Sequence, residues 1–481
     1  MTNTIIKTTP KLMLLLGPLL MAITLIMPVP FTGMSVEAWQ ILGLTLWMAT
    51  WWVSEAVPVA VTAFLPLVVV PIVGIAPIDT VAAPYAHPLI FLFLGGFLIS
   101  IAMERWHLHK RIALKAMTLV GAKQSQQIAG MMAVTAFLSM WMSNTATAVM
   151  MLPIGLSVID MINQDNNKAN DSFSKAMLLA IAFSASIGGL ATLIGTPPNA
   201  LMAAYLANNY QIEIGFAQWM IVGVPLTLVM LVLCWLTLTK FSFKLDNTSV
   251  ETGTLFQDKL AALGAMTKGE KYVLGFFALA AISWVFRPLI VKTTGLAITD
   301  TGIAMFVGLM LFIVPVDSKK DQRILAWDDT KKLPWGVLIL FGGGLTLAGL
   351  IKQSGLADYI GSQLENAANF PIIFAILMIT ATVIFLTEVT SNTATAASFL
   401  PLLGPIAVTL TGGPLTFVIP AALAASCAFM MPVATPPNAI IFSSGQLRIA
   451  DMARVGFGLN IAAVIVITLL MVTLVPRVIS L

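Results

Sequence analysis

Residues 142–153 read MSNTATAVMMLP, and residues 390–401 read TSNTATAASFLP. A second shared phrase follows each copy, GTPPNA at 195–200 and ATPPNA at 434–439. Two phrases that recur in the same order indicate that a whole structural element has been duplicated. Both copies lie in apolar surroundings, so the fold depends on how a hydrophobic chain accommodates these small polar clusters.

Composition places this chain in a membrane. It has 481 residues, of which 58% are hydrophobic and only 10% charged, whereas a soluble domain has about 25% charged residues. The sequence therefore predicts an all-α polytopic membrane protein. Cys234 and Cys427 lie in apolar runs and are expected to be buried thiols. Lys7 and Lys11 precede an apolar run that lacks a small-residue cleavage site, which favours a retained span over a signal peptide.

Apolar runs of about 20 residues can each form one spanning helix, and the sequence predicts eleven transmembrane helices. Two further stretches, 127–159 and 370–410, are too long for one span and are interrupted by SNT. We interpret each as a re-entrant hairpin that lies within protein around a polar cavity, because lipid-exposed loops leave amides unpaired. The eleven runs are 12–29, 37–53, 56–73, 88–104, 175–193 with 197–207, 215–238, 271–288, 300–316, 334–351, 415–432 with 436–445, and 456–476.

The distribution of Lys and Arg fits this arrangement. With a cytoplasmic N-terminus and one crossing per span, all but four of the 25 Lys and Arg lie on the cytoplasmic side, as the positive-inside rule requires. The sequence thus predicts a cytoplasmic N-terminus and an extracellular or periplasmic C-terminus. Compact loops favour the inner (plasma) membrane of a bacterium. The four exceptions are Arg287, Lys292, Lys352 and Arg477.

The duplication extends beyond the two phrases. LGGFLISIAMERWHLHKRI at 94–112 resembles FGGGLTLAGLIKQSGLADYI at 341–360. In the predicted topology the two halves run in opposite directions, which points to a secondary transporter with a midplane substrate site. We divide the chain into an N-terminal span at 1–36, a first repeat at 37–239, a cytoplasmic linker at 240–270 and a second repeat at 271–481. The run 317–332 is interpreted as a solvated loop.

The repeated phrases carry groups suited to ions. At a hairpin tip, the second half-helix presents free backbone N–H groups and a partial positive charge, which attract an anion. The proline pairs of TPPN interrupt a helix and leave carbonyl oxygens unpaired. Such carbonyl oxygens coordinate Na⁺ in transporters with broken helices.

The scarcity of basic residues in the spans restricts how an anion can be held. Apart from Arg287 at an outer edge, no Lys or Arg lies well inside a predicted span. An uncompensated buried carboxylate would cost many kcal/mol, so helix ends, polar donors and co-bound Na⁺ must balance its charge. Two facing SNT sites suit a ligand with two anionic ends, and we predict a C4–C5 dicarboxylate such as succinate.

The paired SNTATA and TPPNA phrases, together with WWVSEAVPVAVTAFLPL at 51–67, resemble the divalent anion/sodium symporter family, the INDY-type dicarboxylate transporters. The resemblance covers essentially the whole chain. It implies a homodimer in the lipid bilayer, with a scaffold domain and an elevator-like transport domain. It also implies one dicarboxylate site flanked by two sodium sites, and no nucleic-acid partner.

The resemblance also implies site residues by motif. One sodium site would use Ser139, Ser143, Asn144 and the region of Gly195, and the other Thr387, Thr390, Asn392 and the region of Ala434. Substrate carboxylates would contact Asn144, Thr145, Asn392 and Thr393. The substrate-binding set also includes Ser143, Ser391, Thr196, Thr435, Pro198 and Pro437.

Several alternatives stay open. Branches of the family exchange dicarboxylates without sodium, and others carry citrate or sulfate. An intramembrane enzyme is disfavoured because no HExxH motif and no Asp lies in a span interior, and a channel would more typically show continuous polar faces. Glu388 is either a functional acid or a hydrogen-bonded structural one. Glu55 is interpreted as structural, and surface roles are expected for His87, His107 and His109.

Overall fold

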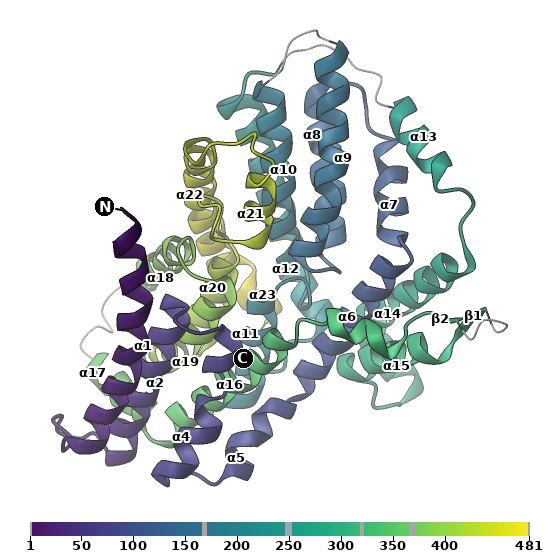
Figure 1. The fold of residues 1–481 in the computed structure, drawn as a ribbon. Coiled ribbons are helices and arrows are strands. Elements are labelled where there is room, and N and C mark those ends of the chain that lie inside the picture. Colours follow the sequence, from purple (N-terminus) through teal and green to yellow (C-terminus); the bar gives the residue numbers. More distant parts are fainter. Residues whose placement is uncertain (1, 166–170, 246–252, 318–321, 365–370, 480–481) are drawn as a thin grey trace.

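The computed structural model describes residues 2–165, 171–245, 253–317, 322–364 and 371–479, and this part of the chain is almost entirely helical (Figure 1). Its only sheet pairs two short strands, β1 (Pro315–Asp317) and β2 (Gln322–Arg323). The predicted all-α class is therefore confirmed. The middle of the predicted linker (246–252), together with Lys168, Lys319 and Lys320, lies outside the described residues.

The first half of the chain contains the first SNT and TPPN phrases. It consists of α1 (Thr2–Ile26), α2 (Val36–Ser54), α3 (Val59–Thr62), α4 (Leu65–Val73), α5 (Ile78–Ala82), η1 (Ala83–Ala86), α6 (Pro88–Arg105), α7 (Leu108–Met117), α8 (Gln124–Ser139), α9 (Asn144–Asp165), α10 (Asp171–Gly189), α11 (Pro197–Tyr210), α12 (Phe216–Leu236) and η2 (Thr237–Ser242).

The second half repeats much of this order after α13. It consists of α13 (Gly253–Ala262), α14 (Lys268–Thr294), α15 (Asp300–Ile313), η4 (Trp327–Lys332), α16 (Trp335–Gln353), α17 (Leu356–Leu364), α18 (Ile372–Thr387), α19 (Asn392–Thr411), α20 (Leu415–Ala425), α21 (Pro436–Phe442), α22 (Ile449–Thr473) and α23 (Val475–Val478). The series from α6 to α12 thus corresponds, element by element, to the series from α16 to α22.

The predicted spans coincide with helices. Every one of the eleven apolar runs falls on one helix or on two consecutive helices, and the two interrupted stretches become the pairs α8–α9 and α18–α19. In the described residues, eight helices are long and apolar enough to cross a membrane by themselves. Two of these eight, α9 and α19, belong to the hairpins. Among the other predicted spans, α2 and α15 are single helices that fall short of this criterion, whereas α3–α4 and α20–α21 are divided near prolines.

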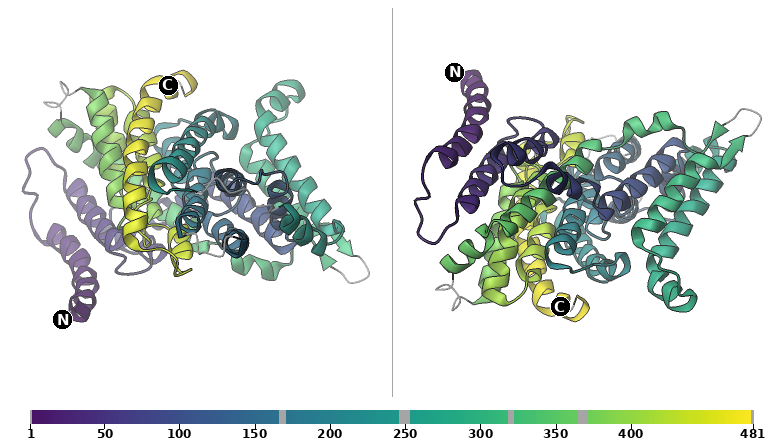
Figure 2. Two further views of the ribbon diagram at one scale, coloured as in Figure 1. Left: turned by 90° about the horizontal axis from the view of Figure 1, so that it is seen from above. Right: turned by 90° about the horizontal axis from the view of Figure 1, so that it is seen from below.

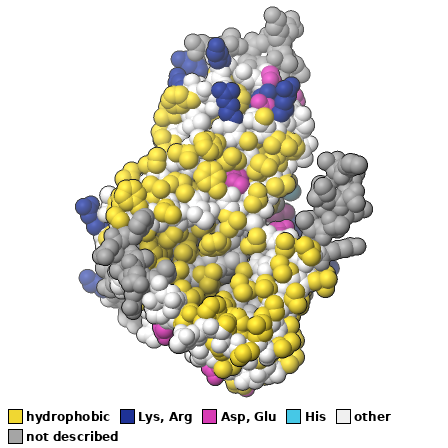
Figure 3. Space-filling model, turned by 90° about the vertical axis from the view of Figure 1, so that its left-hand side faces the viewer, with side chains coloured by type: hydrophobic (Ala, Val, Ile, Leu, Met, Phe, Trp, Pro, Cys, Tyr) yellow, Lys and Arg dark blue, Asp and Glu magenta, His cyan; other side chains and the backbone are white. Residues whose placement is uncertain are grey.

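The outer surface is broadly apolar. Figure 3 shows hydrophobic side chains over most of one face, with Lys and Arg gathered toward the upper end and one edge. Ile461, Ile465 and Leu469 on α22 and Phe374 and Met378 on α18 are exposed. Exposed apolar faces of this extent are expected where lipid, rather than water, surrounds the protein.

The two hairpins and the two TPPN segments form one packed group of helices. The hairpin α8–α9 packs on α10, the hairpin α18–α19 packs on α20, and α10 contacts α21, so both hairpins and both TPPN segments are packed together. The remaining long helices lie outside them, with α1 and the α14–α15 pair at opposite ends of the molecule (Figure 2). The hairpin α8–α9 occupies the upper part of Figure 1 and α18–α19 the lower left.

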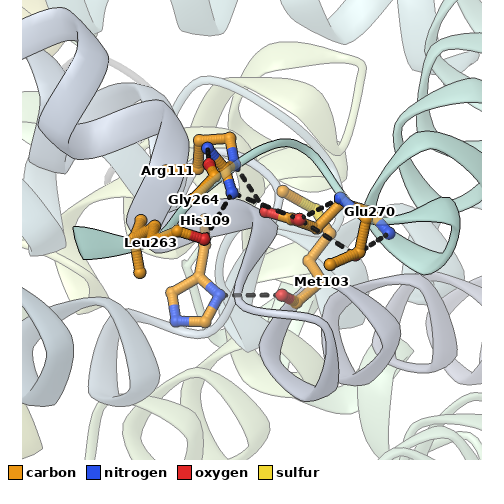
Figure 4. Close-up of polar contacts among 7 residues, drawn as sticks. Met103, His109, Arg111, Leu263, Gly264 and Glu270 are labelled. Atoms are coloured by element: carbon orange, nitrogen blue, oxygen red, sulfur yellow. Dashed lines mark hydrogen bonds and ion pairs between the residues drawn. The ribbon is translucent and has the colours of Figure 1, made fainter. Parts of the chain in front are cut away.

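A buried ion pair fixes α7 beside α14. Nε of Arg111 donates to Oε1 of Glu270 at 2.6 Å, and the guanidinium also donates to the carbonyl oxygens of Leu263 and Gly264 (Figure 4). Glu270 closes a capping box with Thr267 at the start of α14. The first hairpin is therefore joined to the rest of the protein through a helix that is itself firmly held.

Two expectations from the sequence were wrong. His109 is buried, and its Nδ1 lies 2.8 Å from the carbonyl oxygen of Met103, because α7 folds back against α6 and turns that side chain inward. The run 317–332 is not simply a solvated loop. Its last part forms η4, in which Asp329 pairs with Arg105 of α6, and Lys332 at the end of η4 lines a cavity although its side chain is half-exposed.

Candidate functional site

Each SNT phrase lies at a helix N-terminus. Helix α9 begins at Asn144 and α19 at Asn392, so each serine precedes the first helical residue. Oγ of Ser143 accepts a hydrogen bond from the amide of Ala146 at 3.2 Å, and Ser391 is the N-cap of α19. The free amides of two half-helices are thus presented at the hairpin tips, as the sequence predicted.

Each TPPN phrase begins the short helix that follows a break. Between α10 and α11, Nδ2 of Asn199 donates to the carbonyl oxygens of Gly189, Leu190 and Thr192 at 2.9–3.3 Å. Between α20 and α21, Nδ2 of Asn438 donates to the carbonyl oxygens of Ala428 and Met431 at 3.1 and 3.0 Å. The asparagine of TPPN therefore satisfies carbonyl groups that the broken helix leaves without partners.

The four phrases meet around one cavity of about 700 Å³, which we call the central cavity. It is lined by every residue of the predicted substrate-binding set except Pro198, whose neighbour Pro197 lines it instead. Both hairpin tips contribute, although they are far apart in the sequence. The lining residues from this set are Ser143, Asn144, Thr145, Thr196, Ser391, Asn392, Thr393, Thr435 and Pro437.

Behind the first hairpin tip, oxygen atoms converge on Asn144. Its side-chain amide faces Oγ of Ser139 at 2.6 Å and the carbonyl oxygens of Ala185 and Gly195 at 3.1 and 3.3 Å, and it satisfies all three when its nitrogen is turned toward them. Oγ of Ser139 also lies 2.6 Å from the carbonyl oxygen of Ala185. The Ser139 hydroxyl can therefore donate to Ala185 while it accepts from the Asn144 amide, so this amide satisfies the first cluster when no ion is bound.

The second hairpin repeats the arrangement. Oγ1 of Thr387 lies 2.8 Å from Oδ1 of Asn392 and 3.1 Å from the carbonyl oxygen of Ala425. Ser139 and Thr387 are both fully buried, and Gly195 and Ala434 occupy equivalent places beside the two TPPN breaks. The hydroxyl of Thr390 points elsewhere, since it bonds the Leu386 carbonyl oxygen at 3.0 Å and the Thr395 hydroxyl at 2.7 Å.

These donor sets fit sodium. Buried oxygens that face one another repel unless a proton or a cation lies between them, and broken-helix carbonyls with side-chain oxygens are the ligands that Na⁺ uses in transporters of this kind. Either the Asn144 amide turns its nitrogen to these oxygens or a cation supplies the missing positive charge. No group of three or more His, Cys, Asp or Glu in the described residues offers an alternative metal site.

The sequence did not reveal every member of the clusters. The carbonyl oxygens of Ala185 and Ala425 carry no side-chain signal, and their positions depend on how the helices pack. Gly189 was also missed, although a Cβ there would lie 2.9 Å from Oδ1 of Asn144 and 3.0 Å from the Gly195 carbonyl oxygen. The GG pair at 188–189, which lies shortly before TPPN, is the signal that could have pointed to this close approach.

Glu388 is a hydrogen-bonded structural acid. Its carboxylate accepts from the amides of Phe429, Met430 and Met431 at 2.8–3.0 Å and from Nδ2 of Asn460 at 2.7 Å. It does not line the central cavity. The carboxylate thus satisfies the amides of the turn between α20 and α21, and of the two readings that the sequence allowed, the structure favours the structural one.

Three charged side chains line the central cavity in the described part of the chain. Glu55, at the left-handed C-cap of α2, lies on its wall together with Glu104 and Lys332. Lys332 is the only basic residue of the described chain that lines this cavity, and its Nζ is paired with Glu104 at 3.2 Å. No basic side chain of the described residues belongs to either oxygen cluster, but Lys332 brings to the wall of the central cavity a basic group that the sequence did not predict there.

The family model for the sodium:sulfate symporter transmembrane region matches residues 8–481. The chain belongs to this family. Among curated members, the sodium-dependent dicarboxylate transporter SdcS of Staphylococcus saprophyticus is 44% identical over 97% of this chain and 92% of its own length. SdcS of Staphylococcus aureus strain USA300 is also 44% identical, over 97% of this chain and 91% of its own.

Two solved structures share the fold of this chain. The YdaH transporter of Alcanivorax borkumensis superposes with a TM-score of 0.57 at 11% identity and covers 96% of this chain and 97% of its own. MtrF of Neisseria gonorrhoeae has a TM-score of 0.52 at 14% identity, covering 96% and 94%. At these identities the likeness concerns the architecture alone.

Proposed function

We propose that this chain is a secondary transporter that imports C4–C5 dicarboxylates, such as succinate, together with sodium ions. The observation that carries the proposal is the pair of oxygen clusters, Ser139–Asn144–Ala185 and Thr387–Asn392–Ala425, on either side of one cavity. The 44% identity to sodium-dependent dicarboxylate transporters supports the same substrate class. The chain is not an enzyme in this account.

In this proposal the two asparagines couple the ions to the substrate. Asn144 and Asn392 each belong to an oxygen cluster and each line the central cavity. A sodium ion in either cluster places positive charge directly behind a half-helix N-terminus, where it strengthens the attraction for a carboxylate. The dianion in turn offsets the charge of the two ions, so each ligand raises the affinity for the other.

The ligand sets follow from the same geometry. The first sodium site would use Ser139, Ser143, Asn144 and the backbone at Gly195, and the second Thr387, Asn392, Thr390 through its backbone, and the backbone at Ala434. The substrate carboxylates would contact the tips at Thr145 and Thr393. A cavity of about 700 Å³ with a binding tip on each side suits a two-ended anion better than sulfate.

The topology and the transport cycle belong to the same proposal. The N-terminus lies in the cytoplasm, the halves are inverted repeats with the boundaries given above, and the protein sits in the plasma membrane as a homodimer. The hairpins and TPPN segments pack on one another, which is what a mobile transport domain in an elevator mechanism requires. Their placement in opposite parts of Figure 1 is consistent with inverted repeats.

Reconstitution tests the proposal directly. Uptake of labelled succinate into proteoliposomes is expected to require an inward sodium gradient, with lithium or potassium unable to replace sodium. A competition panel of succinate, citrate, sulfate and α-ketoglutarate, with and without sodium, identifies the preferred anion. Equal uptake without sodium would instead support a dicarboxylate exchanger, and inhibition by sulfate alone would support a sulfate carrier.

A further inference from the structure

A second, larger cavity adjoins the central cavity. Its volume is about 1010 Å³, and it lies among the end of α6, the helices α7, α9 and α13, and the end of η4. It shares Glu104, Ala146 and Lys332 with the central cavity, so the two spaces meet at these three residues. We call the larger space the basic vestibule.

The basic vestibule carries an excess of positive charge. Arg105, Lys110, Lys259 and Lys332 line it, and among the described residues Glu104 is the only acidic one that does so. Arg105 is paired with Asp329, whereas Nζ of Lys259 bonds the neutral hydroxyl of Ser157 at 2.6 Å. A concave surface of one sign concentrates ions of the opposite sign, so this space attracts anions.

Lys332 is placed where the two cavities meet. Its pairing with Glu104 is long, at 3.2 Å, and the two side chains are 52% and 43% exposed. Ion pairs exposed to this degree contribute only about 0–1 kcal/mol. A carboxylate that arrives from either cavity can therefore compete with Glu104 for the ammonium group.

The walls that present these charges are held in place. The Arg111–Glu270 pair and the bonds from Arg111 to the backbone of Leu263 and Gly264 join α7 to the segment between α13 and α14 (Figure 4). The Arg105–Asp329 pair joins α6 to η4 in the same way. The segments that carry most of the basic residues are thus joined to their neighbours, and α9, from the first hairpin, makes another wall of the vestibule.

We propose that the basic vestibule is an accessory binding site for di- and tricarboxylate anions, and that Lys332 holds one carboxylate of the substrate as it passes to or from the central cavity. In doing so Lys332 exchanges its partner Glu104 for the substrate. This inference rests on the proposed function, and it places the accessory site on the side that we propose faces the cytoplasm. Lys332 is a positioning residue for transport and takes no part in the sodium sites.

The experiment measures affinity on the vestibule side. Sealed vesicles of defined orientation give the half-saturating succinate concentration for counterflow with the vestibule side exposed. Lys332→Gln is expected to raise this half-saturating concentration about two- to fivefold, the range of a half-exposed ion pair, and Lys332→Arg is expected to return it to the wild-type value. Glu104→Gln removes the carboxylate that competes with the substrate for Lys332, so it is expected to lower the half-saturating concentration. Added salt should weaken vestibule-side binding more in the wild type than in Lys332→Gln.

Lys331 provides the matched control. It precedes Lys332, is 76% exposed, pairs with Asp328 within η4 and lines neither cavity, so Lys331→Gln is expected to leave the vestibule-side affinity unchanged. An unchanged affinity in Lys332→Gln, or a shift in the same direction in Lys332→Gln and Glu104→Gln, would overturn the proposal while wild-type uptake still upholds the proposed function. Absence of sodium-dependent uptake in the wild type would overturn both.

Discussion

Oδ1 of Asn392 lies 2.8 Å from the hydroxyl oxygen of Thr387, and the side-chain amide of Asn144 lies 2.6 Å from that of Ser139. In each pair the hydroxyl belongs to the last residue of the first half-helix, and the amide belongs to the first residue of the second. Each pair therefore closes the gap of a re-entrant hairpin with oxygen atoms, and this shared geometry underlies the expectations below.

Thr387 and Thr390 should respond differently to loss of the hydroxyl. Thr387→Val removes an oxygen from the second cluster, so the half-saturating sodium concentration for succinate uptake should rise about three- to tenfold, as for the loss of one good polar contact. Thr387→Ser should restore it. The hydroxyl of Thr390 bonds Leu386 and Thr395 instead, so Thr390→Val should change sodium dependence less. A larger effect in Thr390→Val would contradict this assignment.

Gly189 should tolerate no side chain. A Cβ at this position would lie 2.9 Å from Oδ1 of Asn144, so Gly189→Ala should displace the amide and weaken sodium-dependent uptake at least tenfold. Gly275 on α14 has nothing within 4 Å of the same added atom, and Gly275→Ala should preserve uptake and slightly stabilise the helix. Wild-type sodium dependence in Gly189→Ala would contradict the close packing of the first cluster.

Loss of the Glu388 carboxylate should lower the thermal stability of the protein. Glu388→Gln replaces an oxygen with an N–H₂ group that faces the amides of residues 429–431, and unsatisfied buried donors of this kind cost roughly 2–4 kcal/mol. The melting temperature of the purified protein should fall by several degrees. Glu37→Gln, at an exposed position in α2, is the control and should have little effect. A stable Glu388→Gln protein that loses sodium coupling would instead indicate a functional acid.

His109 should make the protein sensitive to mild acid. Burial lowers the pKa of its imidazole from the ordinary value of 6.5, so the unfolded chain binds a proton more readily than the folded protein. The stability from neutral His109 is complete above about pH 6.5 and declines as the pH falls toward the lowered pKa. Between pH 7.5 and 5.5 the wild type should lose more thermal stability than His109→Gln. His107→Gln, at an exposed position, should behave as the wild type.

The sequence predicted the spans and the hairpins, and nearly all the substrate residues that it predicted line the central cavity. These features are local, because apolar length, the SNT interruptions and the proline pairs all lie within short segments whose chemistry is visible in single letters. The placement of Asn144 and Asn392 at half-helix N-termini followed from the same short-range logic. Among the predicted substrate residues, only Pro198 failed to reach the cavity wall.

What could not be predicted depends on contacts between distant segments. The carbonyl oxygens of Ala185 and Ala425 join the clusters only because α10 and α20 end beside the hairpin tips. The partners of Glu388 lie beyond α20 and on α22, and Lys332 lies beside the cavity at the end of η4, which Asp329 joins to Arg105 of α6. Neither backbone oxygens nor pairings between residues far apart in the sequence leave a periodic signal.

The sodium dependence of succinate uptake tests the central claim most directly. Initial rates in proteoliposomes, measured against external sodium, should follow a sigmoidal curve for the wild type because two clusters load together. Asn144→Ala and Asn392→Ala should each raise both the half-saturating sodium concentration and the half-saturating succinate concentration and should reduce the steepness of the curve. A wild-type rate that is indifferent to sodium, or an Asn144→Ala or Asn392→Ala variant with wild-type sodium affinity, would contradict the account.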